Sequence, residues 1–218
     1  MPVLQISRQP DALAWFDSVP GQPLLVAEQV LIGAVMASRP AQQPWLWMGP
    51  REQGLGNFEL PLRTLVLHRQ QDCFSGSLRC GLPLPLPTES IGNLVVQHVL
   101  DDAIDNLLDE CVRVLEPGGR LWLFTLNPWS PYRARWRHSG LVARSPHAWR
   151  LNLRRLGLQP CAGNTRYLGP IWRTSYNLQK PGPALLRAAC LLEFEKRTAA
   201  LIPPAPATRQ WQAGATPA

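Results

Sequence analysis

The stretch NLVVQHVLDDAIDNLLDECVRVLEPGGRLWLFTL, residues 93–126, decides the fold of this chain. It opens with NLVVQH (93–98), an apolar run that predicts a strand, and closes with RLWLFTL (120–126), a run that is apolar on both faces. A strand with two apolar faces is typical of the middle of a parallel sheet. Between the two runs, apolar residues at helical spacing mark one face of a helix: Ile104, Leu107, Leu108, Cys111, Val112 and Leu115.

The two ends of this predicted helix carry the residues that helix ends favour. Asp101 and Asp102 stand where an N-cap and a first helical turn favour negative charge. EPGG (116–119) ends the helix, because a proline followed by two glycines cannot extend it. Strand, helix and strand with short connections predict a right-handed βαβ crossover, and therefore a parallel sheet.

Upstream of this unit, helices are expected at 11–19 and 22–38. Short strands are expected at 45–48 (WLWM) and 62–68 (LRTLVLH). Residues 82–88 (LPLPLPT) predict an extended loop, because alternate prolines remove the donors that a central strand needs. The second helix carries one stripe at three-to-four spacing, formed by Leu24, Leu25, Glu28, Leu31, Ile32 and Val35.

Downstream of residue 130, the sequence predicts one more helix and the last strands. Residues 145–156 predict a helix, with Ser145 as its N-cap and Pro146 at the first helical position. Residues 158–168 predict a strand. Residues 184–197 (ALLRAACLLEFEKR) predict a final strand with its lead-in.

The predicted fold class is α/β, a doubly wound and mostly parallel sheet with helices on both faces. A chain of 218 residues is long enough for one domain with a well-buried core. We expect a single domain over 1–197, in which the Gly- and Pro-punctuated residues 169–183 form an insertion. Residues 198–218 predict a disordered tail.

Composition argues against several classes of protein. The N-terminus lacks the basic-then-apolar pattern of a signal peptide, and no apolar run approaches the ~20 residues that span a bilayer. The five cysteines are odd in number and form no CxxC pair, which argues against a disulfide framework and a tetrahedral zinc site. We therefore expect a cytoplasmic protein without a metal site.

Charge is distributed unevenly along the chain. Residues 1–130 hold 8 Arg against 13 Asp plus Glu, a net charge of −5, and residues 131–218 hold 14 Arg plus Lys against 2 Glu, a net charge of +12. Such asymmetry can indicate an anionic partner such as RNA, a phosphorylated substrate or a membrane surface. The 20 Arg against 2 Lys can equally reflect genome composition.

Residues 129–155 combine aromatic and basic side chains. Arginines pair with phosphates, and aromatic rings stack on exposed bases, so this composition suits RNA. The alternative is a solvated helical face whose tryptophans pack in the core. The segment contains Trp129, Tyr132, Trp136 and Trp149 among seven arginines, at positions 133, 135, 137, 144, 150, 154 and 155.

Residues 84–128 resemble the class I S-adenosylmethionine-dependent methyltransferases, in the branch of the ubiquinone-methylase-like enzymes. The resemblance implies an enzyme that transfers a methyl group from S-adenosylmethionine to an acceptor. The chain also resembles a group of bacterial methyltransferase-like proteins with a similarly altered glycine loop and a tail like PATRQW (206–211). The matching motifs are Leu84, Pro85 and Leu86 in a loop, Gln97, His98, Val99 and Leu100 in a turn, and Arg113, Val114, Leu115, Pro117, Gly118 and Gly119 at a helix end.

LWMGPREQGLG (46–56) occupies the place of the cofactor loop of that family and departs from its pattern. Closely spaced glycines let a backbone turn tightly and approach a ligand. Here Gly49 is in place, whereas Gly54 and Gly56 are displaced. The degenerate loop raises the question of whether the cofactor is still bound.

The resemblance also implies which residues form the cofactor site. In the family an acidic residue at the end of the second strand accepts bonds from both ribose hydroxyls, where this chain has His68 and Arg69. An Asp of the family that meets the adenine amine is replaced by Arg79, Cys80 and Gly81. The implied cofactor-binding residues are Met48, Gly49, His68, Cys80, Gly81, Leu82, Gln97 and His98.

His98 is the candidate catalytic residue. It follows the fourth strand at the carboxyl edge of the sheet, where open α/β folds bind their ligands. It can act as a general base or line the cofactor pocket, and the alternative is a hydrogen-bonded structural histidine. Asn127 can hold a substrate or cap a turn. Cys80 and Cys111 have no activating neighbour in the sequence, so we expect both to be inert.

Two functions therefore stay open. The first is methyl transfer from S-adenosylmethionine to an unknown acceptor. The second is a methyltransferase fold without catalysis, acting as a regulatory or RNA-binding partner. The replaced cofactor anchors favour the second function. The intact series of loop, strand, helix and PGG turn does not decide between the two functions. A nicotinamide dehydrogenase is less well supported, because the sequence has no GxGxxG motif.

Overall fold

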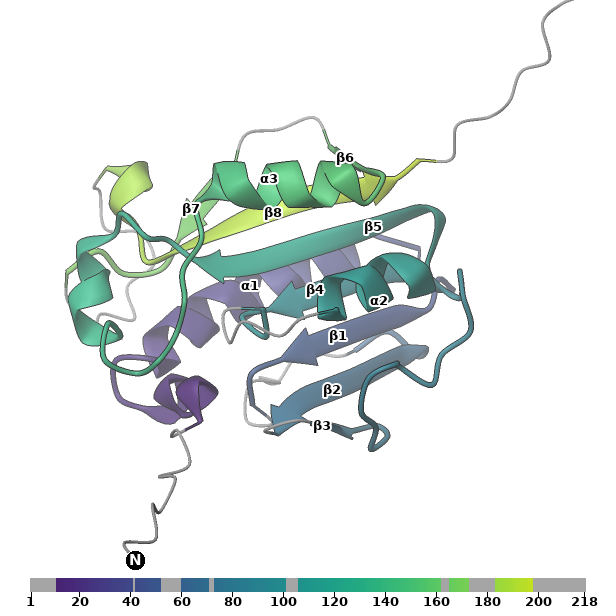
Figure 1. The fold of residues 1–218 in the computed structure, drawn as a ribbon, viewed down its shortest axis with the longest axis horizontal. Coiled ribbons are helices and arrows are strands. Elements are labelled where there is room, and N and C mark those ends of the chain that lie inside the picture. The colour runs from purple at the N-terminus through teal and green to yellow at the C-terminus, as the bar shows by residue number, and fades with distance from the viewer. Residues whose placement is uncertain are drawn as a thin grey trace, which may run out of the picture.

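A computed structural model describes residues 11–40, 42–51, 60–70, 73–100, 106–161, 165–172 and 183–197 (Figure 1). Helices and strands follow one another along these residues as the sequence pattern predicts for an α/β chain. Their bounds are η1 (Ala12–Asp17), α1 (Gln22–Ala37), β1 (Trp45–Gly49), β2 (Thr64–Gln70), β3 (Cys73–Gly76), β4 (Ile91–Gln97), α2 (Leu107–Val114), β5 (Leu115–Leu126), η3 (Pro131–Arg135), α3 (Pro146–Arg155), β6 (Leu158–Pro160), β7 (Arg166–Leu168), η4 (Ala184–Leu186) and β8 (Ala189–Lys196).

One 8-stranded sheet organises the molecule, with the strand order β3-β2-β1-β4-β5-β8-β6 and β7 pairing with β8. The four central strands β2, β1, β4 and β5 are parallel, whereas β3 and β8 run antiparallel to their neighbours. In Figure 1, α2 and α3 cover one face of the sheet and α1 covers the other. The predicted fold class, a mostly parallel sheet with helices on both faces, is confirmed.

Each face of the sheet packs its own hydrophobic core. Side chains alternate between the faces along a strand, so in β1 Trp47 joins the core under α1 and Met48 joins the core under α2 and α3. In β5, Phe124 and Leu123 divide in the same way. All four side chains are buried. The apolar runs of the central strands therefore supply both cores.

The EPGG segment ends the helix but also belongs to the following strand. Helix α2 ends at Val114, and β5 begins at Leu115 rather than at the predicted residue 120. Ile91 pairs with Leu115 and Asn93 pairs with Arg120, so four residues of β5 lie opposite the single residue Gly92. This irregularity is a bulge, which a sequence pattern for a helix terminator does not reveal. Asp101 and Asp102 lie outside the described residues.

The other predicted elements match the structure to different degrees. The helix predicted at 145–156 is α3, where Ser145 Oγ accepts a hydrogen bond from the Ala148 amide at 3.2 Å. The predicted final strand is β8, and residues 82–88 form no strand, as expected. The helix expected at 11–19 is the 3-10 helix η1, and the strand expected at 62–68 begins at Thr64.

The C-terminal part differs more from the sequence prediction. The strand expected at 158–168 is two short strands, β6 and β7, because both pair with β8 at different positions along it. Most of the predicted insertion, 173–182, lies outside the described residues. The predicted disordered tail, 198–218, also lies outside them.

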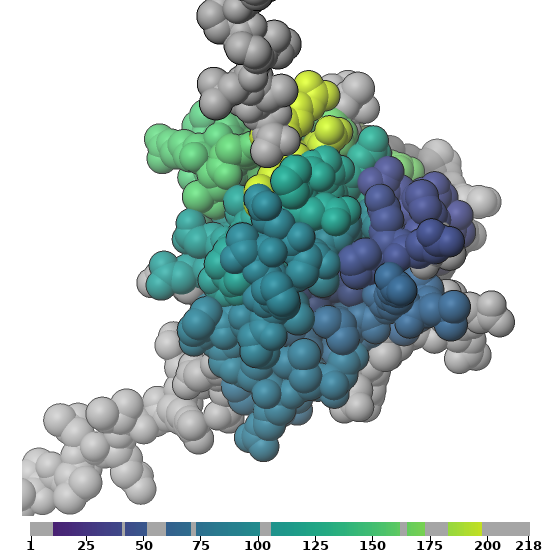
Figure 2. All heavy atoms as spheres, turned by 90° about the vertical axis from the view of Figure 1, so that its right-hand side faces the viewer, coloured from purple at the N-terminus to yellow at the C-terminus, as the bar shows by residue number. Residues whose placement is uncertain are grey.

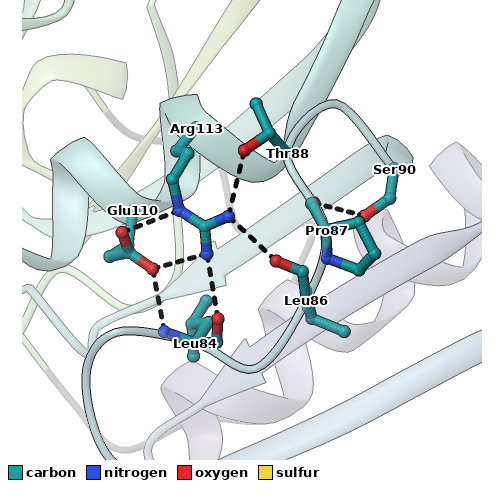
Figure 3. Close-up of polar contacts among 7 residues, drawn as sticks. All are labelled: Leu84, Leu86, Pro87, Thr88, Ser90, Glu110 and Arg113. Atoms are coloured by element: carbon teal, nitrogen blue, oxygen red, sulfur yellow. Dashed lines mark hydrogen bonds and ion pairs between the residues drawn. The ribbon is translucent and has the colours of Figure 1, made fainter.

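Arg113 joins α2 to the loop before β4 (Figure 3). Its guanidinium donates to both carboxylate oxygens of Glu110 at 2.8 Å, and to the carbonyl oxygens of Leu84 and Leu86 at 2.9 Å. Glu110 in turn accepts from the Leu84 amide at 2.8 Å. The loop motif and the helix-end motif are thus two halves of one structural contact. Figure 2 views the amino edge of the sheet, where the segments leading into β4 and β5 cover the centre.

Candidate functional site

The strand order reverses direction between β1 and β4. From β1, the next strand in the chain, β2, lies on one side, and β4 lies on the other. The parallel strands end at the same edge of the sheet, seen as their arrowheads in Figure 1. At that edge Gly49 ends β1, its register partner His68 lies near the end of β2, and Gln97 ends β4. Open α/β sheets bind ligands at such a switch point.

A chain of buried polar side chains lies at this switch point. Glu28 of α1 forms an ion pair with His98, with 2.7 Å between Oε1 and Nε2. The other Glu28 oxygen accepts a hydrogen bond from Gln97 Nε2 at 2.8 Å. The indole nitrogen of Trp47 donates to Gln97 Oε1 at 3.2 Å. The network therefore ties α1 to the carboxyl ends of β1 and β4.

The contact between Glu28 and His98 is fully removed from water. The side chains of Glu28 and His98 are both 0% exposed. Removing a carboxylate from water costs several kcal/mol, which hydrogen bonds and an opposite charge only partly return. Each group is engaged here by at least one polar partner, as a buried charge requires. The contact between Glu28 and His98 is thus suited to fixing the position of the end of β4.

His98 also has an unusual backbone conformation. Its φ is +58°, in the left-handed region that non-glycine residues seldom adopt. Its amide donates to the Phe124 carbonyl oxygen at 3.0 Å, and its ring stacks on Phe16 with 4.5 Å between centroids. Such conformations persist where the surroundings hold them, and they cluster at functional sites. The turn after β4 is held from η1, α1 and β5 together.

The described start of the loop after β1 is anchored to the N-terminal helix. Arg51 contacts Asp11 at 3.0 Å and Asp17 at 2.9 Å, so the residue that departs from the glycine pattern has an electrostatic role. A Cβ placed on Gly49 would lie 3.6 Å from Gln97 Oε1, an ordinary contact distance. Gly49 is itself buried, beside the side chains of Trp47 and Gln97. Gly54 and Gly56 lie outside the described residues.

Met48 and His68 lie next to Gly49, and neither matches the family pattern of a ribose anchor. Met48 is fully buried, and its side chain packs in the core under α2 and α3, on the face away from Glu28. His68 is 5% exposed and is level with Gly49 in the sheet. The end of β2 therefore presents an imidazole where the resembled family has a carboxylate.

The remaining predicted cofactor residues, Cys80, Gly81 and Leu82, lie further from the switch point. Cys80 pairs with Phe74 beyond β3, three strand spacings from β1 and so roughly 15 Å away. Burial, and then the neighbouring Cys73, raises the pKa of the Cys80 thiol. A raised pKa leaves little thiolate at neutral pH, in agreement with an inert cysteine. The structure brings Gly49, Gln97 and His98 together and leaves Cys80 apart from them.

Asn127 and Cys111 have structural surroundings. Asn127 is fully buried and donates to the carbonyl oxygens of Leu185 and Arg187, both at 2.8 Å. Its side-chain oxygen accepts a hydrogen bond from the Trp129 amide at 3.1 Å. This bond is the turn cap that an asparagine side chain commonly forms. Cys111 is fully buried in the core under α2 and α3, and burial raises its pKa. Cys111 thus lies on the face of the sheet away from Glu28, and the hydrogen bonds of Asn127 go to backbone groups outside the polar network.

The basic segment 129–155 exposes its arginines more than its aromatic rings. Trp129 is 61% exposed, whereas Tyr132, Trp136 and Trp149 are buried and pack in the cores. Buried rings cannot stack on bases, so one aromatic residue is left for that role. The arginines at 133, 135, 137, 144, 154 and 155 are exposed.

The described residues contain no group of three or more His, Cys, Asp or Glu side chains that could hold a metal ion. Within the same residues, no helix is long and apolar enough to cross a membrane.

No protein-family model matches this sequence, and a search of curated proteins finds no match. Several solved structures are similar to this chain. A methyltransferase dependent on S-adenosylmethionine from Thermotoga maritima has a TM-score of 0.52 at 14% identity, over 84% of this chain and 94% of that chain. A second such methyltransferase, from Archaeoglobus fulgidus, has a TM-score of 0.52 at 12% identity, over 77% of this chain and 94% of that one.

A chain from the Haloferax volcanii complex between the Trm112 methyltransferase activator and a methyltransferase has a TM-score of 0.54 at 14% identity. The match covers 85% of this chain and 95% of that chain. At identities this low, the likeness establishes the fold alone. This chain therefore has the Rossmann-like fold of the S-adenosylmethionine-dependent methyltransferases.

Sequence reasoning missed the partner of His98. Glu28 is the single acidic residue of α1, and it falls on the stripe of that helix that faces the core. A carboxylate at a core-facing position needs a partner, so this placement was the available signal. The identity of the partner was not readable, because His98 lies 70 positions away in the sequence. Trp47 and Phe16 fall within the strand and helix expected at 45–48 and 11–19, and their sequence positions predict no role at the site for either.

Proposed function

We propose that this protein binds S-adenosylmethionine at the carboxyl edge of β1 and β4 and transfers its methyl group to an acceptor. The observation that carries the proposal is Gly49, which ends β1 beside Gln97 at the point where the strand order reverses. We further propose that the chain belongs to the ubiquinone-methylase-like branch, in the bacterial subgroup with an altered glycine loop. The loop, turn and helix-end motifs around β4 and α2 support this finer assignment.

The residues present fit one end of this cofactor better than the other. At Gly49 the backbone carries no side chain, so a ligand can approach it closely. The Glu28 carboxylate is fully buried and engaged by His98 and Gln97, so its role is to orient Gln97 rather than to contact the ligand. At the end of β2, His68 can accept one hydrogen bond, where a carboxylate would accept from both ribose hydroxyls. We therefore propose that Gly49 and Gln97 hold the methionine end, with a weaker contact at the ribose.

The chemistry assigned to the chain is mainly positioning. When bound, S-adenosylmethionine supplies a methyl group that its sulfonium already activates. The residues of the chain then have to hold the acceptor in line with the methyl–sulfur bond and to preserve the geometry of the site. We propose that Glu28 acts through His98 and Gln97 to fix the end of β4, so His98 is a positioning residue. Its Nε2 already contacts Glu28, which leaves that nitrogen unavailable as a base.

The test is calorimetric titration of the full chain with S-adenosylmethionine and with its demethylated product. The key variant is Gly49→Ala, because the added Cβ meets only ordinary contacts in the protein and would stand where a ligand approaches. We expect the wild type to bind in the micromolar range, and Gly49→Ala to bind at least about tenfold more weakly with an unchanged melting temperature. Gly81→Ala, where a Cβ has open space, tests whether the site extends to Cys80 and Leu82.

The same titration separates the two functions. The absence of binding at millimolar ligand would overturn the methyltransferase proposal and support the non-catalytic alternative, a regulatory partner with this fold. Equal binding by wild type and Gly49→Ala would place the ligand away from the switch point. If the wild type binds S-adenosylmethionine, incubation with the methyl-labelled cofactor and a cell extract would show which class of molecule accepts the label.

An anionic partner of residues 129–155 is a separate proposal, supported by the exposed arginines and by Trp129. RNA contacts made through phosphates weaken steeply as salt rises. We expect filter retention of single-stranded RNA at low salt, and a smaller salt dependence when Arg133, Arg135 and Arg137 are changed to Gln. No retention at low salt would overturn this proposal.

A further inference from the structure

A cavity lies between α1 and the segment of β7, and none of its lining residues belongs to the polar network at the switch point. Its volume is about 320 Å³, at the lower end of the range of small-molecule pockets. Ala27, Val30 and Leu31 of α1 form one side. Arg166 and Leu168 of β7 form the opposite side, and Arg187 closes the rim.

The position of this cavity follows from side-chain alternation. Residues two apart on a strand share a face, so Arg166 and Leu168 both face α1, where Leu168 joins the core under that helix. The turn after β7 packs tightly on the helix, because a Cβ on Gly169 would lie 2.5 Å from Leu24 Cδ1. The wall of the cavity is thus closely packed at that end.

Helix α1 supplies an apolar surface that the chain leaves exposed. Val30 is 57% exposed and Val26 is 39% exposed. A helix that is apolar all round is normally buried. The single acidic residue of α1, Glu28, is engaged on the sheet side by Gln97 and His98. The cavity floor therefore has apolar surface and no negative charge of its own.

Two arginines give this apolar cavity a positive rim. Arg166 is exposed, and Arg187 is half-buried and donates from Nη1 to the Gly169 carbonyl oxygen at 3.0 Å, which holds its guanidinium in place. None of the residues lining the cavity is acidic. The local charge is complementary to an anion.

We propose that this cavity binds a small molecule with an apolar body and one carboxylate, held between Arg166 and Arg187 with its body on Val30 and Leu31. Guanidinium groups recognise carboxylates through paired hydrogen bonds, and the apolar body gains from leaving water. The site is distinct from the proposed methyl-donor site, because none of the residues lining the cavity belongs to the network of Glu28, Trp47, Gln97 and His98.

The test is calorimetric titration of the full chain with octanoate and with octanol, which share a chain length and differ in charge. We expect octanoate to bind at least about tenfold more tightly than octanol. Arg166→Gln should remove about tenfold of the octanoate affinity and leave octanol unchanged. Val30→Asp should weaken octanoate by a similar factor, whereas Val26→Asp, one turn away and outside the cavity, should not.

Several results would overturn the proposal. Equal affinities for octanoate and octanol would show that the arginines do not recognise the head group. Equal octanoate binding by the wild type, Arg166→Gln and Val30→Asp would place the ligand elsewhere, and no heat at millimolar octanoate would remove the site. Saturating S-adenosylhomocysteine should leave the octanoate affinity unchanged, and competition between the two would contradict a separate site.

Discussion

Two glutamate–cation pairs of this fold have nearly the same contact distance and different surroundings. Glu110 lies 2.8 Å from Arg113, and Glu28 lies 2.7 Å from His98. The first pair is 15% and 31% exposed and binds the backbone of the loop before β4, whereas the second is 0% exposed. A partly exposed pair keeps part of its hydration, whereas a fully buried pair loses all of it. The comparison indicates that the first pair supports the frame and the second holds a site in shape.

The largest effect is expected when the buried pair is broken. Glu28→Ala leaves the polar groups of His98 and Gln97 buried without their carboxylate, so we expect a loss of about 3–5 kcal/mol in the free energy of unfolding. Urea unfolding at neutral pH measures this loss. Glu28→Gln keeps an acceptor for Gln97 and should lose less. Gln29→Ala, next to it on α1, is the matched control. A loss below about 1 kcal/mol for Glu28→Ala would mean that water solvates the pair.

The frame contact should respond more weakly and more locally. Arg113→Lys replaces a planar fork with a point charge, so the contacts to Glu110, Leu84 and Leu86 cannot all be kept. We expect a smaller loss of stability than for Glu28→Ala, together with faster hydrogen exchange at the Leu84 amide. Arg79→Lys, at an exposed position before the loop, is the control. Unchanged exchange at Leu84 would show that the loop holds its shape without the clamp.

The two pairs also show how far the sequence predicts structure. The unit β4, α2 and β5 follows from local periodicity, because each element buries a regular pattern of its own residues. The bulge at Gly92 did not follow, since the four residues from Glu116 to Gly119 match a helix terminator equally well. The Glu28–His98 pair did not follow either, because it joins two elements through side chains that are ordinary when taken singly.

A pH titration sharpens the comparison at the clamp. The hydrogen bond from Arg113 lowers the pKa of the Glu110 carboxyl below its ordinary value. A lowered pKa in the folded state means that the contribution to stability is complete above the ordinary value. It is lost as the pH falls through the lowered value. The stability difference between wild type and Arg113→Gln should therefore shrink in acid, as urea midpoints across the acid range would show. A difference that stays constant with pH would contradict the assignment.

The smallest effect is expected at a third pair, Arg120 with Glu193, which joins β5 to β8 at 2.9 Å. Its side chains are 35% and 36% exposed, so water and salt screen the attraction. Arg120→Gln should change the free energy of unfolding by no more than about 1 kcal/mol, and added salt should reduce that change further. A larger change would mean that burial does not rank the three pairs. The expected order, which follows burial while the distances stay nearly equal, would show that desolvation sets what each pair does in this fold.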